Sequence, residues 1–304
     1  MSSYDFADLT SGGIPADVRL AVIGDPVDHS LSPEFQNAAL VSRELPMRYG
    51  RLQLQPDELR PAFEWLRQSA FVGWNVTIPH KAAVLALVDE VDPVAQRFGS
   101  VNTVVNRAGR LFGFNTDGPG IAAAVAEAFE IDFQPTVVGI LGAGGATGRT
   151  IARQMVLSGT KQFCLCNRTP EKLAGLQREL SDQAEIRLFQ WDQLEQFFTS
   201  AGLIINASAL GLDGAELNWN PAWINSNHRV FDVVYGAAET PLVRWARRSG
   251  AEAVDGLGML LHQGRLAFEI WFGPPVPVEQ MRKALWDAVG RKRNGESASR
   301  RVGE

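Results

Sequence analysis

The feature that most constrains the fold is a glycine-rich turn, Gly-Ala-Gly-Gly-Ala-Thr at residues 142–147, directly after the apolar segment 136–141. An apolar run that ends in glycine is typical of a buried strand, and the residues after the turn favour a helix. Expected strands and helices then alternate along the chain, at residues 163–166, 170–180, 203–206, 230–234 and 241–249. Strands that alternate with crossover helices predict an α/β domain with a parallel, Rossmann-type sheet.

Length and composition set the class of protein. A chain of 304 residues suggests about two domains, and 45% hydrophobic with 21% charged residues excludes a disordered chain, a coiled coil and a collagen. The net charge of −5 argues against a general nucleic-acid partner. We find neither an apolar run of about 18 residues nor a secretory signal, so we expect no membrane span and a cytoplasmic location. There Cys164 and Cys166 would remain small apolar residues.

The remaining segments predict the domain organisation. We expect residues 1–117 to form a first α/β domain that is completed by helices at 258–290, with 118–257 as the nucleotide-binding domain and 291–304 as a flexible tail. Within the first domain, the pattern predicts a loose start, a strand at 19–24, helices at 33–44, 56–68 and 81–89, and a hairpin of strands 101–105 and 110–114. Ser32 is the expected N-cap of the helix at 33.

The glycine turn also predicts a cofactor. Glycine at 142 permits a tight turn, glycine at 144 lets the backbone approach a pyrophosphate, and the next helix offers free N–H groups. Thr147 stands at the third position of the usual fingerprint. An NAD site places an acid after the next strand, but here Asn167, Arg168 and Thr169 follow it, with Lys172 one turn later. A guanidinium suits a 2′-phosphate, so we expect NADP. The alternative is a structural turn with Arg168 on a surface loop.

Four polar clusters lie outside the nucleotide-binding pattern, at residues 29–32, 75–81, 101–103 and 115–118. Each follows a predicted strand or begins a predicted helix, where functional groups gather in α/β proteins. Serines, asparagines, one lysine and one aspartate suit a small anion with many hydroxyls, and a Lys–Asp pair suits proton transfer. Individually, Ser32 could be a helix cap, Asn102 a turn residue and Lys81 a solvated helix start. The four histidines have no metal-ligand spacing, so we expect no metal.

Taken together, these motifs resemble the shikimate dehydrogenase family. The matching segments are SLSP at 30–33, NVTIPHK at 75–81, VNT at 101–103, NTDG at 115–118, GAGGA at 142–146, NRT at 167–169, NAS at 206–208 and DGLGML at 255–260. They follow the family order and cover nearly the whole chain from about Leu20 to Phe272. Three places depart from the family pattern: Trp74, which has the bulk to reshape a pocket wall, His80, and the segment 206–210, a mild variant of a segment that is usually richer in Ser and Thr.

The resemblance implies a role for each matching residue. Ser30 and Ser32 would hold the substrate carboxylate, and Thr77 and Lys81 would contact the ring hydroxyls and the reacting oxygen. The other substrate-binding residues would be Asn75, Asn102, Asp117, Tyr235 and Gln263. The cofactor would contact Gly142, Ala143, Gly144, Gly145, Ala146, Asn167, Arg168, Thr169 and Lys172, with Val233 and Gly256 beside the nicotinamide.

The resemblance also implies an activity. The enzyme would use NADPH to reduce 3-dehydroshikimate to shikimate, reversibly, in aromatic amino-acid biosynthesis, with Lys81 and Asp117 as the acid–base pair. The substrate would lie in a cleft between the two domains, and the enzyme would be a monomer or a homodimer. The alternatives are a quinate/shikimate dehydrogenase, an aminoshikimate dehydrogenase, and a catalytically silent ligand sensor on the same fold.

Overall fold

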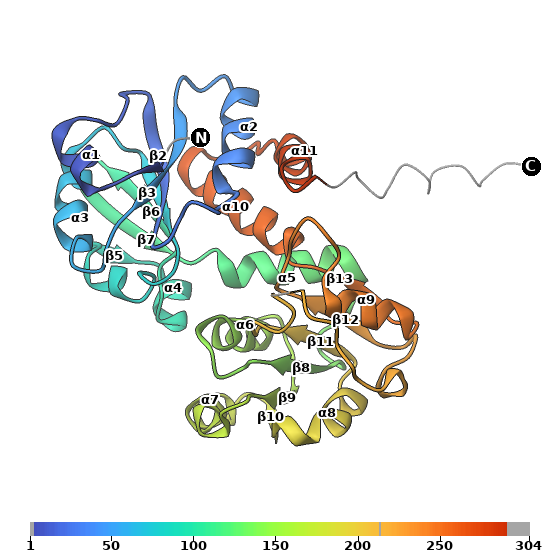
Figure 1. The fold of residues 1–304 in the computed structure, drawn as a ribbon. Helices are drawn as coiled ribbons and strands as arrows, with labels where there is room; N and C mark the ends of the chain where they lie inside the picture. Colours follow the sequence, from blue (N-terminus) through green and yellow to red (C-terminus); the bar gives the residue numbers. More distant parts are fainter. Residues whose placement is uncertain (1–2, 213, 291–304) are drawn as a thin grey trace, which may run out of the picture. The chain divides into compact units, whose positions relative to one another are not determined.

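The computed structural model describes residues 3–212 and 214–290, which form two compact units with one β-sheet each (Figure 1). Unit 1 comprises Met1–Thr116 and Gly264–Glu304, and unit 2 comprises Asp117–Gln263. The sequence pattern places the return to the first domain at residue 258. Helix α10 (Leu257–Phe272) is continuous across that position, so no loop marks the boundary there. The predicted tail at 291–304 lies outside the described residues.

Unit 1 has a mixed, mainly parallel sheet of seven strands among its described residues, in the order β1-β3-β2-β4-β6-β7-β5. The strands are β1 (Ser3–Tyr4), β2 (Val18–Gly24), β3 (Arg48–Gln53), β4 (Gly73–Val76), β5 (Glu90–Val91), β6 (Thr103–Arg107) and β7 (Arg110–Phe114). Strand β6 is antiparallel to β4 and β7. The turn between β6 and β7 has positive φ at Ala108 (51°) and Gly109 (89°), which a two-residue hairpin favours, and the predicted hairpin is confirmed.

The helices of unit 1 depart from the prediction at one place. They are α1 (Phe6–Ser11), α2 (Ser32–Ser42), α3 (Leu59–Gln68), the 3-10 turn η1 (Ala83–Ala86), α4 (Pro93–Phe98) and α11 (Val278–Ala288), with the end of α10. The helix predicted over 81–89 is wrong, because only η1 forms there. The backbone N–H of Asp89 donates to the carbonyl of Leu111, which draws the chain into the pairing of β5 with β7.

The prediction of a loose N-terminal start is also wrong. Strand β1 pairs with β3, and a reciprocal capping box between Asp5 and Asp8 begins helix α1. Leu9 on that helix is fully buried in the core of unit 1. One buried leucine and a capped turn are too short to give a periodic signal, so hydrophobic patterning does not detect them.

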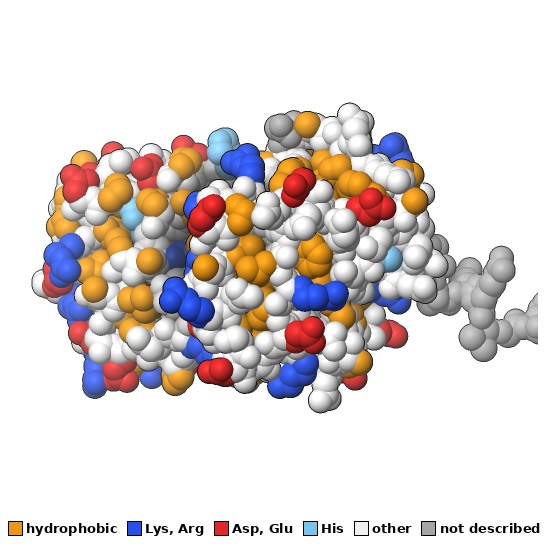
Figure 2. Space-filling model, turned by 90° about the horizontal axis from the view of Figure 1, so that it is seen from below, with side chains coloured by type: hydrophobic (Ala, Val, Ile, Leu, Met, Phe, Trp, Pro, Cys, Tyr) orange, Lys and Arg blue, Asp and Glu red, His pale blue; other side chains and the backbone are white. Residues whose placement is uncertain are grey.

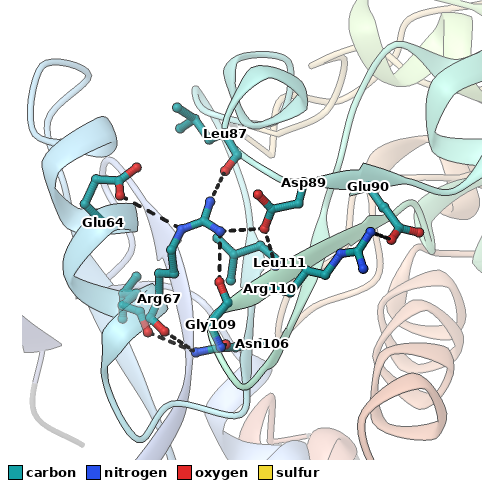
Figure 3. Close-up of polar contacts among 10 residues, drawn as sticks. Glu64, Arg67, Leu87, Asp89, Glu90, Asn106, Gly109, Arg110 and Leu111 are labelled. Carbon is teal, nitrogen blue, oxygen red and sulfur yellow. Dashed lines mark hydrogen bonds and ion pairs between the residues drawn. The ribbon is translucent and has the colours of Figure 1, made fainter.

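A single arginine connects three segments of unit 1 that are distant in sequence (Figure 3). Arg67, at the end of α3, donates to the carboxylate of Asp89, to the carbonyl of Gly109 in the hairpin turn, and to the carbonyl of Leu87. Hydrogen bonds from the Leu111 N–H and from Arg67 lower the pKa of Asp89. The guanidinium therefore holds the hairpin and the segment before β5 against α3.

The described residues of unit 2 form a six-stranded, fully parallel sheet in the order β10-β9-β8-β11-β12-β13, which confirms the predicted α/β fold. The strands are β8 (Val137–Leu141), β9 (Gln162–Cys166), β10 (Glu185–Phe189), β11 (Leu203–Asn206), β12 (Arg229–Asp232) and β13 (Glu252–Val254). The helices are α5 (Asp117–Phe129), α6 (Ala146–Leu157), η2 (Pro170–Leu173), α7 (Ala174–Leu180), η3 (Trp191–Gln193), α8 (Leu194–Ser200), η4 (Pro221–Trp223) and α9 (Pro241–Arg248).

Alternate residues of the strands of unit 2 enter two separate cores. Val138 and Ile140 of β8 pack into the core that includes residues of α5, α6 and α7, whereas Leu141 packs into the core with α8 and α9. Figure 1 shows these helices on opposite faces of the sheet. Cys164 and Cys166 are buried free thiols in the second core, and burial raises the pKa of Cys166 to about 12. Both therefore act as apolar core residues, as predicted.

The surface is mixed in charge. On the face drawn in Figure 2, Lys and Arg side chains are interspersed with Asp and Glu side chains. Across residues 3–212 and 214–290, we find no helix with the length and apolar character needed to cross a bilayer. The same residues contain no group of three or more His, Cys, Asp or Glu side chains arranged to hold a metal ion.

Candidate functional site

The serine loop, residues 30–32, leads from β2 into α2. Ser30 Oγ accepts a hydrogen bond from the Ser32 N–H at 3.3 Å. Ser32 is the first residue of α2, and Leu31 is the N-cap, whose side chain makes no capping hydrogen bond. The prediction of Ser32 as N-cap is therefore wrong. Burial raises the pKa of the phenol of Tyr49, a residue that the sequence reasoning missed, and the neighbouring Ser32 hydroxyl opposes this shift.

Tyr49 begins a buried network of neutral groups in unit 1. Its hydroxyl donates to Asn75 Oδ1 at 2.8 Å, and Asn75 Nδ2 donates to Thr103 Oγ1 at 3.0 Å. Thr103 donates in turn to Asn102 Oδ1 at 3.1 Å, and Asn102 Nδ2 donates to Thr116 Oγ1 at 3.0 Å. All five residues are at most 5% exposed. The structure therefore brings the predicted residues Asn75 and Asn102 together through Thr103, which lies in the same motif as Asn102, and connects both to Tyr49, which no motif indicated.

This network also holds the backbone next to Asp117. The N–H of Thr116 donates to Asn102 Oδ1 at 2.8 Å, and Asp117 is the first residue of helix α5. A carboxylate is favourable at that position because a helix N-terminus carries partial positive charge. Asn102 is thus more than a turn residue, since its side chain fixes the segment that leads into Asp117.

Thr77 and Lys81 follow strand β4. The Thr77 N–H donates to the Ile23 carbonyl at 2.8 Å, and a Cβ at Gly24 would lie 2.3 Å from Thr77 Cγ2. The Lys81 carbonyl accepts from the Val101 N–H at 2.9 Å, which places Lys81 beside the start of the Asn102 segment. The alternative, that Lys81 is only a solvated residue at a helix start, is not supported, because no helix begins at Lys81 and the residue is half-buried.

Two of the three departures from the family pattern have structural roles. Trp74 is fully buried and packs edge-to-face against Phe63 with ring centroids 5.2 Å apart. Neighbouring residues of a strand point to opposite faces, so Trp74 enters the hydrophobic core while Asn75 enters the polar network. The expected effect of Trp74 on a pocket wall therefore has no support in this packing. His80 is buried, and its Nε2 is 2.8 Å from the Leu54 carbonyl.

In unit 2, the glycine loop follows β8, where the strand order changes direction toward β9 on one side and β11 on the other. Gly142 has φ of +77°, and a Cβ there would lie 2.8 Å from Ser208, in the segment that follows β11. Gly148 meets the requirement for a third glycine, because its Cβ would lie 2.4 Å from the Gly142 carbonyl oxygen. The usual fingerprint places its third glycine at position 147, which is Thr147 here, whereas in this structure the close approach occurs one residue later, at Gly148.

The segment after β9 packs against the glycine loop. Asn167 Oδ1 accepts from the Gly144 N–H at 3.3 Å, and a Cβ at Gly144 would lie 2.7 Å from Lys172 Cβ. Arg168 and Lys172 are exposed. Arg149, which no motif indicated, donates to the carbonyls of Gly144 and Lys172 and connects the two segments. The predicted phosphate-binding residues are therefore neighbours within unit 2.

These residues fit a dinucleotide. No side chain of the described residues caps α6, which leaves its first N–H groups for an anion. The glycine loop has no room for a side chain at Gly144, and Arg168 rather than an acid stands at the tip that follows β9. NADP meets both features through its pyrophosphate and its 2′-phosphate.

The predicted residues beside the nicotinamide also lie together. A Cβ at Gly256 would lie 2.1 Å from the Val233 carbonyl oxygen and 3.2 Å from Tyr235 Cδ1. Burial raises the pKa of Tyr235. Gln263, on α10, is 9% exposed, and its Nε2 donates to the Leu260 carbonyl at 2.8 Å.

A buried carboxyl supports this part of unit 2. Asp232 is fully buried and accepts from Asn206 Nδ2 at 2.8 Å, from Thr240 Oγ1 at 2.7 Å and from the Val234 N–H at 3.1 Å. Burial raises its pKa to about 6, although the hydrogen bonds oppose the shift. Asp232 thus connects the ends of β11 and β12 with the N-cap of α9, and the sequence reasoning missed it.

Comparisons with known proteins match the whole architecture. Family models match over three segments: "Shikimate dehydrogenase substrate binding domain" at residues 22–104, "Shikimate / quinate 5-dehydrogenase" at 124–211, and "Shikimate 5'-dehydrogenase C-terminal domain" at 256–285. A shikimate dehydrogenase (NADP(+)) of Desulfitobacterium hafniense is 40% identical over 272 residues, which cover 89% of this chain and 98% of that protein.

Two solved structures are similar over nearly their full length. Shikimate 5-dehydrogenase of Thermus thermophilus, in complex with NADP(H) and shikimate, has a TM-score of 0.79 and 36% identity, covering 89% of this chain and 99% of that one. Quinate dehydrogenase of Corynebacterium glutamicum, in complex with NAD, has a TM-score of 0.80 and 28% identity, with the same coverage.

Proposed function

The chain belongs to the shikimate dehydrogenase family, and from this premise we propose how its residues carry out the NADP-dependent interconversion of 3-dehydroshikimate and shikimate. The observation that carries the proposal is the buried neutral network of unit 1. It holds Asn75 and Asn102 in fixed orientations beside Ser32, and their hydroxyl and amide groups are the partners that a small ring with several hydroxyls requires.

We propose that Ser30 and Ser32 bind the substrate carboxylate and that Asn75, Thr77 and Asn102 bind the ring hydroxyls. Tyr235 and Gln263 contribute the remaining contacts. Because the network is already hydrogen-bonded before substrate arrives, its donors require little reorganisation on binding.

Lys81 and Asp117 are proposed as the acid–base pair. Lys81 gives a proton to the carbonyl oxygen as it becomes a hydroxyl and takes it back in the reverse direction. Asp117 keeps the ammonium oriented. Bound NADPH supplies the hydride for this reduction.

The cofactor site is proposed to consist of three segments of unit 2. The loop Gly142, Ala143, Gly144, Gly145 and Ala146 would hold the pyrophosphate at the start of α6, and Asn167, Arg168, Thr169 and Lys172 would hold the adenosine with its 2′-phosphate. The backbone at Val233 and Gly256 would lie beside the nicotinamide. Arg149 supports the second segment by joining the carbonyls of Gly144 and Lys172.

The test is reduction of NADP, followed by NADPH absorbance, with shikimate and quinate measured in parallel. Shikimate has a planar ring carbon at its carboxylate, whereas quinate has a tetrahedral carbon with an added hydroxyl. The serine loop begins a helix and cannot follow the changed carboxylate angle, and an unpaired hydroxyl costs about 1–3 kcal/mol. We expect kcat/KM for quinate to be lower by at least about 10²-fold. Comparable values would favour a quinate/shikimate dehydrogenase.

Assembly and location complete the proposal. We propose a monomer or a homodimer that acts in the cytoplasm. Sedimentation of the purified protein at several concentrations would test the assembly, and a larger oligomer would contradict it.

A further inference from the structure

A buried arginine lies directly behind the serine loop. Arg51, on β3, has a side chain that is 8% exposed, and it donates through Nε and one terminal nitrogen to the Ser30 carbonyl, at 3.1 and 2.7 Å. No motif of the sequence indicated it. The guanidinium thus holds the backbone of Ser30, which is proposed to bind the substrate carboxylate.

The positive charge of Arg51 is only partly balanced. Its acidic partner is Glu34, at 3.4 Å through a single contact, and the Glu34 side chain is 34% exposed. Solvent screens a half-exposed carboxylate strongly, whereas the buried guanidinium is screened little. A buried cation whose only carboxylate contact is long and partly exposed is a weak arrangement for stability alone, because this contact offsets little of the desolvation cost.

Two further observations point in the same direction. The serine loop forms the N-terminus of α2, an eleven-residue helix, so the helix adds partial positive charge at the same place. Burial raises the pKa of Tyr49, and the positive charge of Arg51 opposes this shift, so its field reaches the phenol of Tyr49.

We propose that Arg51 makes the serine loop select an anionic carboxylate over a neutral group. It is a positioning residue, because it acts through the Ser30 backbone and through its field. The inference rests on the proposed function, since it assumes that the substrate carboxylate binds at Ser30 and Ser32.

The experiment compares shikimate with its neutral methyl ester, each oxidised with NADP by the full-length protein. We expect Arg51→Met to raise KM for shikimate about tenfold, with kcat changed less than about threefold and KM for the ester nearly unchanged. Arg51→Lys, which retains the charge without the planar fork, should recover most of the affinity for shikimate.

Two more variants complete the experiment: one should change KM in the opposite direction, and the other is a control. Glu34→Gln removes the opposing charge and should lower KM for shikimate about twofold, a direction that a purely structural pair does not produce. Arg48→Met is the matched control, because Arg48 lies on the same strand and pairs with Asp17 at the surface. It should leave both KM values unchanged.

The outcomes separate the two proposals. If Arg51→Met leaves KM for shikimate unchanged, or if it raises KM for shikimate and for the methyl ester by the same factor, the inference is overturned while the activity stands. If Arg51→Met does not fold, an unchanged KM in Glu34→Gln overturns the inference. If the wild type does not oxidise shikimate, the proposed function fails and the inference fails with it.

Discussion

The two units bury polar groups of different kinds. The network of unit 1 runs through Tyr49, Asn75, Thr103, Asn102 and Thr116 and contains only hydroxyls and amides. The corresponding cluster of unit 2 is centred on a carboxyl, Asp232, that receives three hydrogen bonds. Neutral groups lose little on burial once they are hydrogen-bonded, whereas a carboxylate retains a desolvation cost that its partners do not fully offset.

The difference shows in titration. Burial raises the pKa of Asp232 to about 6, with a smaller contribution from Asp255, while the buried amides and hydroxyls of unit 1 carry no charge near neutral pH. A cage for a ring with several hydroxyls benefits from a geometry that does not change with pH. In unit 2, by contrast, one carboxyl, that of Asp232, accepts the hydrogen bonds that connect the ends of β11 and β12 with α9.

The largest effect should come from the charged side chain proposed to act beside the neutral network. Lys81→Met should lower kcat by about 10²–10⁴-fold, the usual contribution of a general acid–base group, while KM changes little because the hydroxyl and amide donors remain. Steady-state kinetics with shikimate and NADP measure both values. Lys161→Met, at an exposed position in unit 2, is the control. Near-wild-type turnover in a folded Lys81→Met protein would remove Lys81 from the mechanism.

The next effect tests the charged cluster directly. The pKa of Asp232 is about 6 in the folded protein against 3.8 for the free carboxyl, so the folded state binds the proton more tightly. This contribution to stability is fully present below pH 3.8 and is lost as pH rises through about 6. It amounts to about 3 kcal/mol.

The free energy of unfolding of Asp232→Asn should therefore rise by about 2–3 kcal/mol relative to wild type between pH 4 and pH 7. Urea unfolding at several pH values measures the difference. The Asn side chain can keep the contacts to Asn206 and Val234, which limits any loss from broken hydrogen bonds. A difference that is constant with pH would show that Asp232 is ionised without penalty.

The third effect concerns an exposed charge in unit 2 rather than a buried one. Arg168→Ala should weaken the binding of NADP by roughly 10–150-fold and leave the binding of NAD little changed, because a charge-assisted phosphate contact contributes about 1.5–3 kcal/mol. Dissociation constants for both nucleotides provide the measurement. Arg178→Ala on α7, also exposed, is the control. Parallel changes for NADP and NAD would contradict the 2′-phosphate assignment.

The smallest effect tests the neutral network. Tyr49→Phe leaves Asn75 Oδ1 buried without its donor and should reduce the free energy of unfolding by about 1–2 kcal/mol. Since no group in the network is charged near neutral pH, the loss should be equal at pH 5 and pH 7. Tyr4→Phe, at a less buried position, should cost less. A loss that varies with pH across this range would mean that a charged group couples to the network.

Local sequence patterns determined much of this protein. The apolar run before Gly142, the alternation of strands and helices, and the hairpin turn at Ala108 and Gly109 depend on backbone conformation and on the burial of one face, so neighbouring residues are enough to predict them. The motif resemblance likewise indicated the family and the residues of the proposed site.

Only the tertiary structure decided what supports those residues. Tyr49, Arg51 and Asp232 act on partners that are between 2 and 26 residues away, and no periodicity connects them to Ser30, Asn75 or Asn206. The segment 81–89 has helical periodicity, yet pairing of β5 with β7 prevents a helix there. Buried hydrogen bonds and strand pairing satisfy backbone and polar groups across the sheet, and their partners are set by which strands lie side by side rather than by the local chain.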